Sequence, residues 1–158
     1  MVYHRKVELP PGFAIADAEP AHLTVLAVVV GSRAGALASE VERLGGQARV
    51  FDGDRMTAEL PDVVEAIELV LAATEERADR RGAVHMGKVT ANDDAVGGHP
   101  GRAAGALADL AEPGRCFITG GVLVEMGDDG FERFATGSIG AAELDGTSYA
   151  VYSIERRG

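Results

Sequence analysis

Apolar and polar residues are arranged along the chain in blocks that predict a mixed α and β domain. The run LTVLAVVV at 23–30 is rich in β-branched residues and ends at Gly31, which is typical of a strand buried on both faces. Residues 47–60 form two short apolar segments around Asp52-Gly53, a pattern that predicts a β-hairpin. Further strands are predicted over 82–89, 116–120, 131–137 and 148–154.

Three segments place their apolar residues at helical spacing, over 36–44, 61–80 and 102–111. Ser32 is expected to cap the first helix, and Pro61 to open the second. The charged residues at the end of the second helix, Arg80 among them, are expected on its outer face. We expect all three helices to pack on one side of the sheet.

The order of these elements predicts an α+β fold, with a ferredoxin-like βαββαβ core and additional C-terminal strands. Residues 1–21 are interpreted as an N-terminal arm and linker, in which VYHRKVEL is a candidate short edge strand. Residues 22–155 form the domain, and residues 156–158 are a tail. A ferredoxin-like core by itself implies no function.

Charge and composition narrow the function classes. With 15 Lys and Arg against 25 Asp and Glu among 158 residues, the formal charge is −10, which disfavours binding to nucleic acid. The single cysteine, Cys116, excludes an internal disulfide. No apolar run approaches the ~20 residues of a membrane span, so we expect a cytoplasmic protein without membrane insertion.

Two loops carry candidate chemistry. Gly31, Ser32 and Arg33 follow a buried strand, where backbone N–H groups can hold phosphate, although an ordinary strand-to-helix turn explains the same residues. Asp54, with Asp52 across Gly53, could ligate Mg²⁺, but hairpin turns favour Asp-Gly regardless of function. Asp93-Asp94 is the second carboxylate segment in a loop. The histidine in the strand 82–89, His85, is expected to be a core or interface residue with satisfied hydrogen bonds and not a catalyst.

The order of short motifs from about Leu23 to Ile154 resembles the class III adenylate/guanylate cyclase catalytic domain. The segments that carry the resemblance are LTVLAVVVGS, GGQARVFDGDRMTAEL, AVHMGKV, GGHPGRAAGALADLAEPGRCFITGG and FERFATGSIGAAELDGTSYAVYSI. The last segment is similar to the family's tail, where a Leu-Lys-Gly segment precedes a Val-Tyr strand. The resemblance implies a nucleotide-cyclase-like fold and head-to-tail dimers with composite sites.

Most of the family's functional residues have no counterpart here. The first metal-binding Asp falls on Val28 or Val29, whereas the second matches Asp54. The purine-selecting Lys falls on Val50, and its partner falls near Ala95. The Asn and Arg that stabilise the transition state in the family fall on Arg102 and Ala106.

These losses predict a degenerate cyclase-like domain that lacks cyclase activity, because two-metal catalysis needs carboxylates that bridge both ions. Such a domain would act in dimerisation, regulation or ligand binding, as a homodimer or with a related cyclase domain or another signalling protein. No cofactor is expected. The alternative is a divergent active cyclase that makes cyclic nucleotide from ATP or GTP with Mg²⁺ or Mn²⁺ at a rearranged site. A small-ligand sensor unrelated to cyclases is a third interpretation.

Overall fold

A computed structural model of the protein describes residues 21–90 and 94–157. One seven-stranded sheet runs through this part of the chain, with strand order β2-β3-β1-β4-β5-β7-β6. All neighbouring strands are antiparallel except β4 and β5, which are parallel. The elements are β1 (Ala21–Val30), η1 (Ala34–Leu37), α1 (Ala38–Arg43), β2 (Gln47–Phe51), β3 (Arg55–Leu60), α2 (Val63–Glu76), β4 (Arg81–Thr90), α3 (His99–Leu110), β5 (Cys116–Thr119), α4 (Gly120–Glu125), α5 (Gly127–Arg133), β6 (Phe134–Leu144) and β7 (Thr147–Arg156).

The first half of the sheet confirms the predicted ferredoxin-like core. The strands β2, β3, β1 and β4 lie side by side in the order that the βαββαβ unit requires. The buried strand β1 lies between β3 and β4, and the predicted hairpin joins β2 to β3 through Asp52 and Gly53, both at positive φ. An Asp-Gly turn adopts this conformation readily, because glycine has no Cβ and aspartate tolerates the left-handed region.

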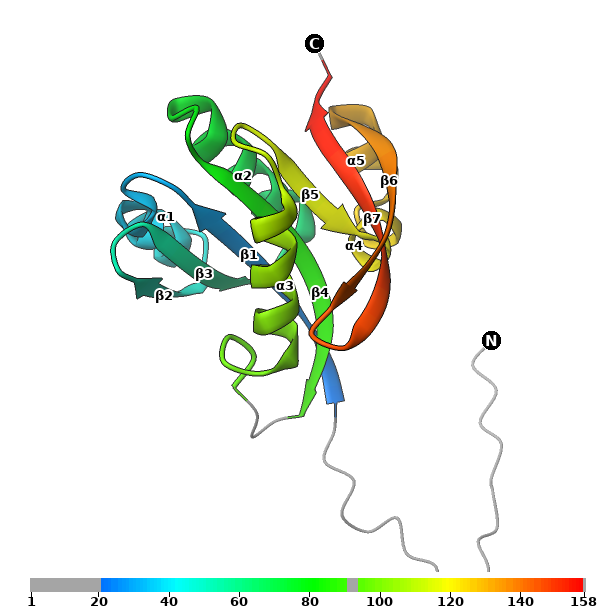
Figure 1. The fold of residues 1–158 in the computed structure, drawn as a ribbon, viewed down its shortest axis with the longest axis horizontal. Helices are drawn as coiled ribbons and strands as arrows, with labels where there is room; N and C mark the ends of the chain where they lie inside the picture. The colour runs from blue at the N-terminus through cyan, green and yellow to red at the C-terminus, as the bar shows by residue number, and fades with distance from the viewer. Residues whose placement is uncertain (1–20, 91–93, 158) are drawn as a thin grey trace, which may run out of the picture.

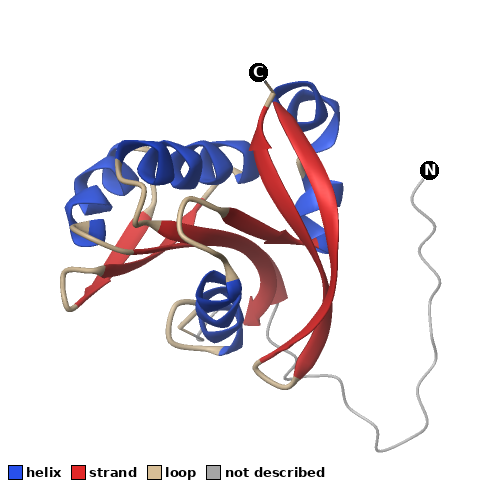
Figure 2. Cartoon of the chain, turned by 45° about the horizontal axis from the view of Figure 1, so that its top comes forward, coloured by secondary structure: helices blue, strands red, loops and turns tan. Residues whose placement is uncertain are grey.

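The helices cover both faces of the sheet, so the prediction that all three pack on one side was wrong (Figures 1 and 2). Alternate residues of β1 belong to two separate cores. Val25, Ala27 and Val29 pack with α1 and α2, whereas Leu26 and Val28 pack with α3. A strand that is apolar at every position needs a cover on each side, and this requirement places α3 opposite α2. We call the two sides the α2 face and the α3 face.

The C-terminal part differs from the prediction over residues 120–144. Two short helices, α4 and α5, precede β6. The second of them ends at Arg133, so the first part of the predicted strand 131–137 is helical. The strands β6 and β7 form a long hairpin at one edge of the sheet (Figure 1). Phe134, the first residue of β6, is fully buried and anchors the end of α5 in the core.

The second helix is shorter than predicted and ends before its charged tail. Asp62 caps it by accepting the Glu65 N–H at 2.9 Å, and the helix ends at Glu76. Arg80 therefore lies in the turn that leads to β4 instead of on an outer helix face, and it is only 1% exposed. No helix within residues 21–90 and 94–157 is long and apolar enough to cross a membrane.

Candidate functional site

The two valines on which the motif match places the family's first metal-binding Asp are part of the hydrophobic core. Val28 is fully buried on the α3 face, where it packs in one cluster with Leu26 and Leu107. Its neighbours across the sheet are Thr57 on β3 and Ala83 on β4. Val29 is also fully buried, on the opposite face. Neither valine can ligate a cation, and a carboxylate at either position would have to be desolvated.

The second metal position, Asp54, lies exposed at the end of the β2–β3 hairpin. Its Oδ1 accepts the Arg33 N–H at 3.2 Å, and its backbone carbonyl accepts the Gly31 N–H at 2.9 Å. Asp54 thus fastens the loop after β1 to the hairpin. Within the described residues, no group of three or more His, Cys, Asp or Glu side chains could hold a metal ion. The donor set does not fit the two-metal centre of the family.

The candidate phosphate loop already binds groups of its own chain. The backbone N–H and the hydroxyl of Ser32 both donate to the Asp79 carboxylate, at 2.8 Å each. These two hydrogen bonds hold the pKa of Asp79 below its usual value. Ser32 therefore binds Asp79. The prediction that Ser32 caps the following helix was wrong. A phosphate at Gly31, Ser32 and Arg33 would have to displace the Asp79 and Asp54 groups.

The buried side chain of Arg80 holds this loop in place through hydrogen bonds to its backbone. Its guanidinium donates to the carbonyls of Ser32 at 2.9 Å, of Arg33 at 3.1 Å and of Ala73 at 3.3 Å. Gly31 has a φ of 133° and lies so close to the turn that an added Cβ would be 2.7 Å from the Arg80 Cα. The glycine therefore permits the close approach, and the arginine pairs the loop carbonyls that the approach buries.

The structure shows an ion pair next to the two positions that the motif match assigned to purine selection. Each partner of the pair lies one residue before the matched position. Val50, which falls on the purine-selecting Lys, pairs with Met56 and packs against Gly35 on the α2 face. The preceding residue, Arg49, instead forms an ion pair with Asp94, Nη1 to Oδ2 3.0 Å. The Arg49 side chain is the first cause that lowers the pKa of Asp94. Strand alternation is the signal that could have found the pair, because successive side chains point to opposite faces.

A second ion pair connects the hairpin to α3. Arg55, at the start of β3, binds Asp109 on α3 at 2.9 Å. Its guanidinium also covers Gly105, where a Cβ would lie 2.7 Å from Nη2. Ala106, which falls on the transition-state Arg of the family, is half-buried in the next turn and has no group to offer a ligand. The Arg49–Asp94 and Arg55–Asp109 pairs hold the hairpin to α3 and to the loop before it.

Arg102, which falls on the transition-state Asn, belongs to a separate polar network at the start of α3. Asp145 in the β6–β7 turn accepts hydrogen bonds from Arg102 Nε at 3.0 Å and is 2.8 Å from His99 Nδ1. The contact with His99 is the first cause that lowers the pKa of Asp145. The other ring nitrogen of His99 is 2.8 Å from the Tyr149 hydroxyl. Asp145 stands in the tail segment similar to Leu-Lys-Gly, and here its contacts are internal.

His85 lies in the core, as expected, but only one of its ring nitrogens has a partner. Its Nδ1 is 2.8 Å from the Thr119 hydroxyl, and no hydrogen-bond partner within the described residues reaches Nε2. The ring is 1% exposed and meets Tyr149 edge to face at 4.8 Å. Burial, with a smaller electrostatic contribution from His99, lowers the pKa of His85 to about 4. Of the other candidates, Ala95 is buried and Asp93 lies outside the described residues.

No protein-family model matches the sequence, and no curated protein sequence matches it. Solved structures do match. An adenylate/guanylate cyclase/hydrolase from Silicibacter pomeroyi is 16% identical over 86% of this chain and 98% of its own, with a TM-score of 0.65. The guanylate cyclase domain from Catenaria anguillulae in complex with GTP is 13% identical over 88% of this chain and all of its own (100%), with a TM-score of 0.64. The adenylyl cyclase from P. aeruginosa is 16% identical over 88% and 97%, with a TM-score of 0.61.

These matches cover nearly the whole length of each cyclase domain and most of this chain. Identities of 13% to 16% establish the shared fold, and the side chains at the site must be judged from this chain alone. The protein therefore has the fold of the adenylate/guanylate cyclase catalytic domains.

Proposed function

We propose that this protein is a non-catalytic cyclase-fold domain that acts by association with a second copy of itself or with another cyclase-fold domain. One observation carries the non-catalytic part. The motif match places the first metal-binding Asp at Val28 or Val29, which are both fully buried core residues, so neither position supplies a carboxylate that could bridge two ions with Asp54. Introducing a carboxylate there would be unfavourable, because its charge would be desolvated in the core.

The internal ion pairs support the same proposal. Arg55–Asp109 and Arg49–Asp94 connect the hairpin to α3 and its preceding loop, in the region that the family uses for nucleotide. Both pairs are partly exposed, so each contributes only about 0–1 kcal/mol to stability. Their functional effect is to satisfy charges that would otherwise be available to a triphosphate or a base.

The alternative function, a divergent active cyclase, is favoured by a different observation. Asp54 is exposed at the hairpin, and Arg49 and Asp94 lie one residue from the two purine-selecting positions. An active site of this kind would need Asp54 for metal and would open the Arg49–Asp94 pair to accept a base. An assay for cyclic nucleotide formation with Mn²⁺ separates the two functions. Only the active cyclase would form product, and it would lose that activity when Asp54 is replaced.

Association is a proposal because the fold is compatible with more than one state. A guanylyl cyclase domain from Blastocladiella emersonii, 12% identical, is described as a non-canonical dimer, whereas adenylate cyclases from Trypanosoma brucei are described in their monomeric state. The α3 face of this chain supplies the relevant surface. Phe51 is 41% exposed and pairs across the hairpin with Arg55, and Leu110 is 54% exposed next to Asp109. Val28 contributes nothing to this surface, because α3 already covers it.

We expect the protein to be a dimer at tens of micromolar concentration and to dimerise more tightly as salt is added. Each protomer carries a formal charge of −10, so salt screens the repulsion between two copies. Leu110→Glu should weaken the dimer, because a charge would have to be buried in the contact. Sedimentation velocity across a salt series measures both effects.

The matched control is Val124→Glu, which adds the same charge at an 80% exposed residue on α4. It should leave the association unchanged. A protein that stays monomeric at low and high salt would contradict self-association, and equal weakening by both variants would place the contact elsewhere.

A further inference from the structure

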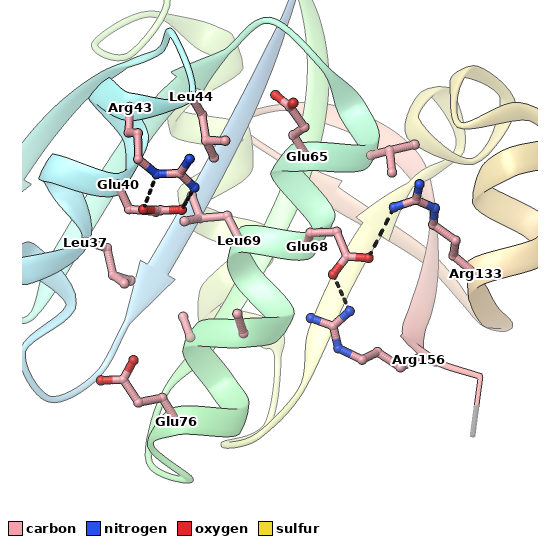
Figure 3. Close-up of a pocket in the computed structure, with 13 residues that line it drawn as sticks. Leu37, Glu40, Arg43, Leu44, Glu65, Glu68, Leu69, Glu76, Arg133 and Arg156 are labelled. Atoms are coloured by element: carbon pink, nitrogen blue, oxygen red, sulfur yellow. Dashed lines mark hydrogen bonds and ion pairs between the residues drawn. The ribbon is translucent and has the colours of Figure 1, made fainter.

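A groove on the α2 face, away from the α3-face surface of Phe51 and Leu110, is not explained by the proposed function (Figure 3). Its volume is about 510 Å³. The helix α2 forms the floor, with α1 on one side and the residues Arg133 and Arg156 on the other. Apolar side chains are accessible along it, namely Leu37 and Leu44 from the first side and Leu69 and Ala72 from the floor.

The charges around this groove leave an acidic excess. Arg43 pairs with Glu40, and both Arg133 and Arg156 contact Glu68. Glu65 has no ion-pair partner among the described residues. Glu76 is 3.7 Å from Arg80, whose guanidinium donates to three backbone carbonyls. An apolar floor with an excess of carboxylates at its rim fits a segment that has both apolar and basic side chains.

A second hollow connects this groove to the beginning of β1. Leu23 and Val25 line it together with Val63 and Val64 of α2, and Val64 also lines the groove. The hollow has a volume of about 400 Å³. Leu23 is 58% exposed, so the chain that precedes Ala21 begins next to this hollow, which shares Val64 with the groove.

We propose that residues 2–9 of the same chain bind in this groove. Their sequence, VYHRKVEL, places Arg5 and Lys6 between apolar residues, and HRK is the only run of three consecutive basic residue types in the chain. The 11 residues 10–20 span up to about 36 Å when extended. The 14-residue helix α2, which forms the floor of the groove, is about 21 Å long, so the tether is longer than this floor.

A nitroxide label on a cysteine introduced at residue 8 tests the proposal in the full chain. The native Cys116 is 1% exposed, and burial raises the pKa of its thiol, so Glu8→Cys is the reactive position. In NMR spectra, the amide signals of Leu37, Leu44 and Ala72 should lose most of their intensity. The signals of Phe51 and Ser138, on the two edge strands, should keep theirs.

Charge variants supply the control. Arg5→Glu with Lys6→Glu should restore most of the lost intensity, and so should Glu65→Lys alone. Combining Glu65→Lys with Arg5→Glu should bring the broadening back. In a second sample, nitroxide-labelled chain without isotope enrichment is mixed with isotope-enriched chain that carries no nitroxide. This sample should show no broadening, because the contact is within one chain. Broadening at β2 or β6, broadening in the mixed sample or no broadening at all would each overturn the proposal.

Discussion

Replacing Arg80 by methionine should lower the free energy of unfolding by about 3–5 kcal/mol, more than any other single charged side chain in the described structure. The guanidinium is 1% exposed and pairs the carbonyls of Ser32, Arg33 and Ala73. Methionine fills a similar volume but donates no hydrogen bond, so these carbonyls lose their donor inside the protein. Urea or guanidinium denaturation followed by circular dichroism measures the difference.

Arg43→Met is the matched control for the arginine at position 80. The Arg43 side chain is 68% exposed and pairs only with Glu40 on the same helix, so its loss should cost less than about 1 kcal/mol. Arg80→Lys should fall between the two, because an ammonium keeps the charge but cannot reach all three carbonyls. Equal denaturation midpoints for the Arg80→Met and wild-type chains would contradict the structural role of Arg80.

Acidification should destabilise the protein through His85. The folded-state pKa is about 4, below the unfolded value of about 6.5, so the unfolded state binds more protons between these pH values. Stability is therefore fully present above pH 6.5 and is lost as the pH falls towards 4. The total loss is about 3 kcal/mol, at up to about 1.4 kcal/mol per pH unit.

Denaturation at a series of pH values from 7 to 5 measures this effect before the carboxylates titrate. His85→Asn should remove most of the slope, because the amide keeps a hydrogen bond with Thr119 and does not take up a proton. His22→Asn changes a histidine at the beginning of β1, and its slope should match the wild type. A wild-type chain with no dependence on pH over this range would show that His85 ionises freely in the folded state.

The parts of the fold that were predictable are those where one local pattern decides the structure. The β-branched run of β1 and the Asp52-Gly53 turn carry such patterns, and both were confirmed. The side on which α3 packs was not decided by its own sequence. It depends on β1 being apolar at every position, which requires a cover on both faces.

The surroundings of charged residues were harder to predict. Arg80 follows the helical pattern of charges at the end of α2, but the helix ends at Glu76 and the arginine turns inward to the carbonyls of the loop after β1. These partners are more than forty positions away in the sequence. No local pattern contains them.

Motif matching located the region of the candidate site but missed the pair that lies in it. A shift of one residue in a strand moves a side chain to the opposite face, so Val50 and Arg49 differ completely in their surroundings. Val28 and Val29, on which the family's first metal-binding Asp falls, are buried in the core and supply no carboxylate to a metal site. The fold was recognisable from the order of motifs, whereas the chemistry depends on individual side chains and their faces.

Cyclic nucleotide formation by the purified full chain is the most direct test of the non-catalytic function. ATP and GTP are each supplied with Mn²⁺, and product is quantified by chromatography for the wild type, Asp54→Ala and the matched variant Asp52→Asn. We predict no product above the protein-free background for any of the three chains. Formation of cyclic AMP or cyclic GMP by the wild type and by Asp52→Asn, but not by Asp54→Ala, would contradict the proposal and establish a divergent active cyclase.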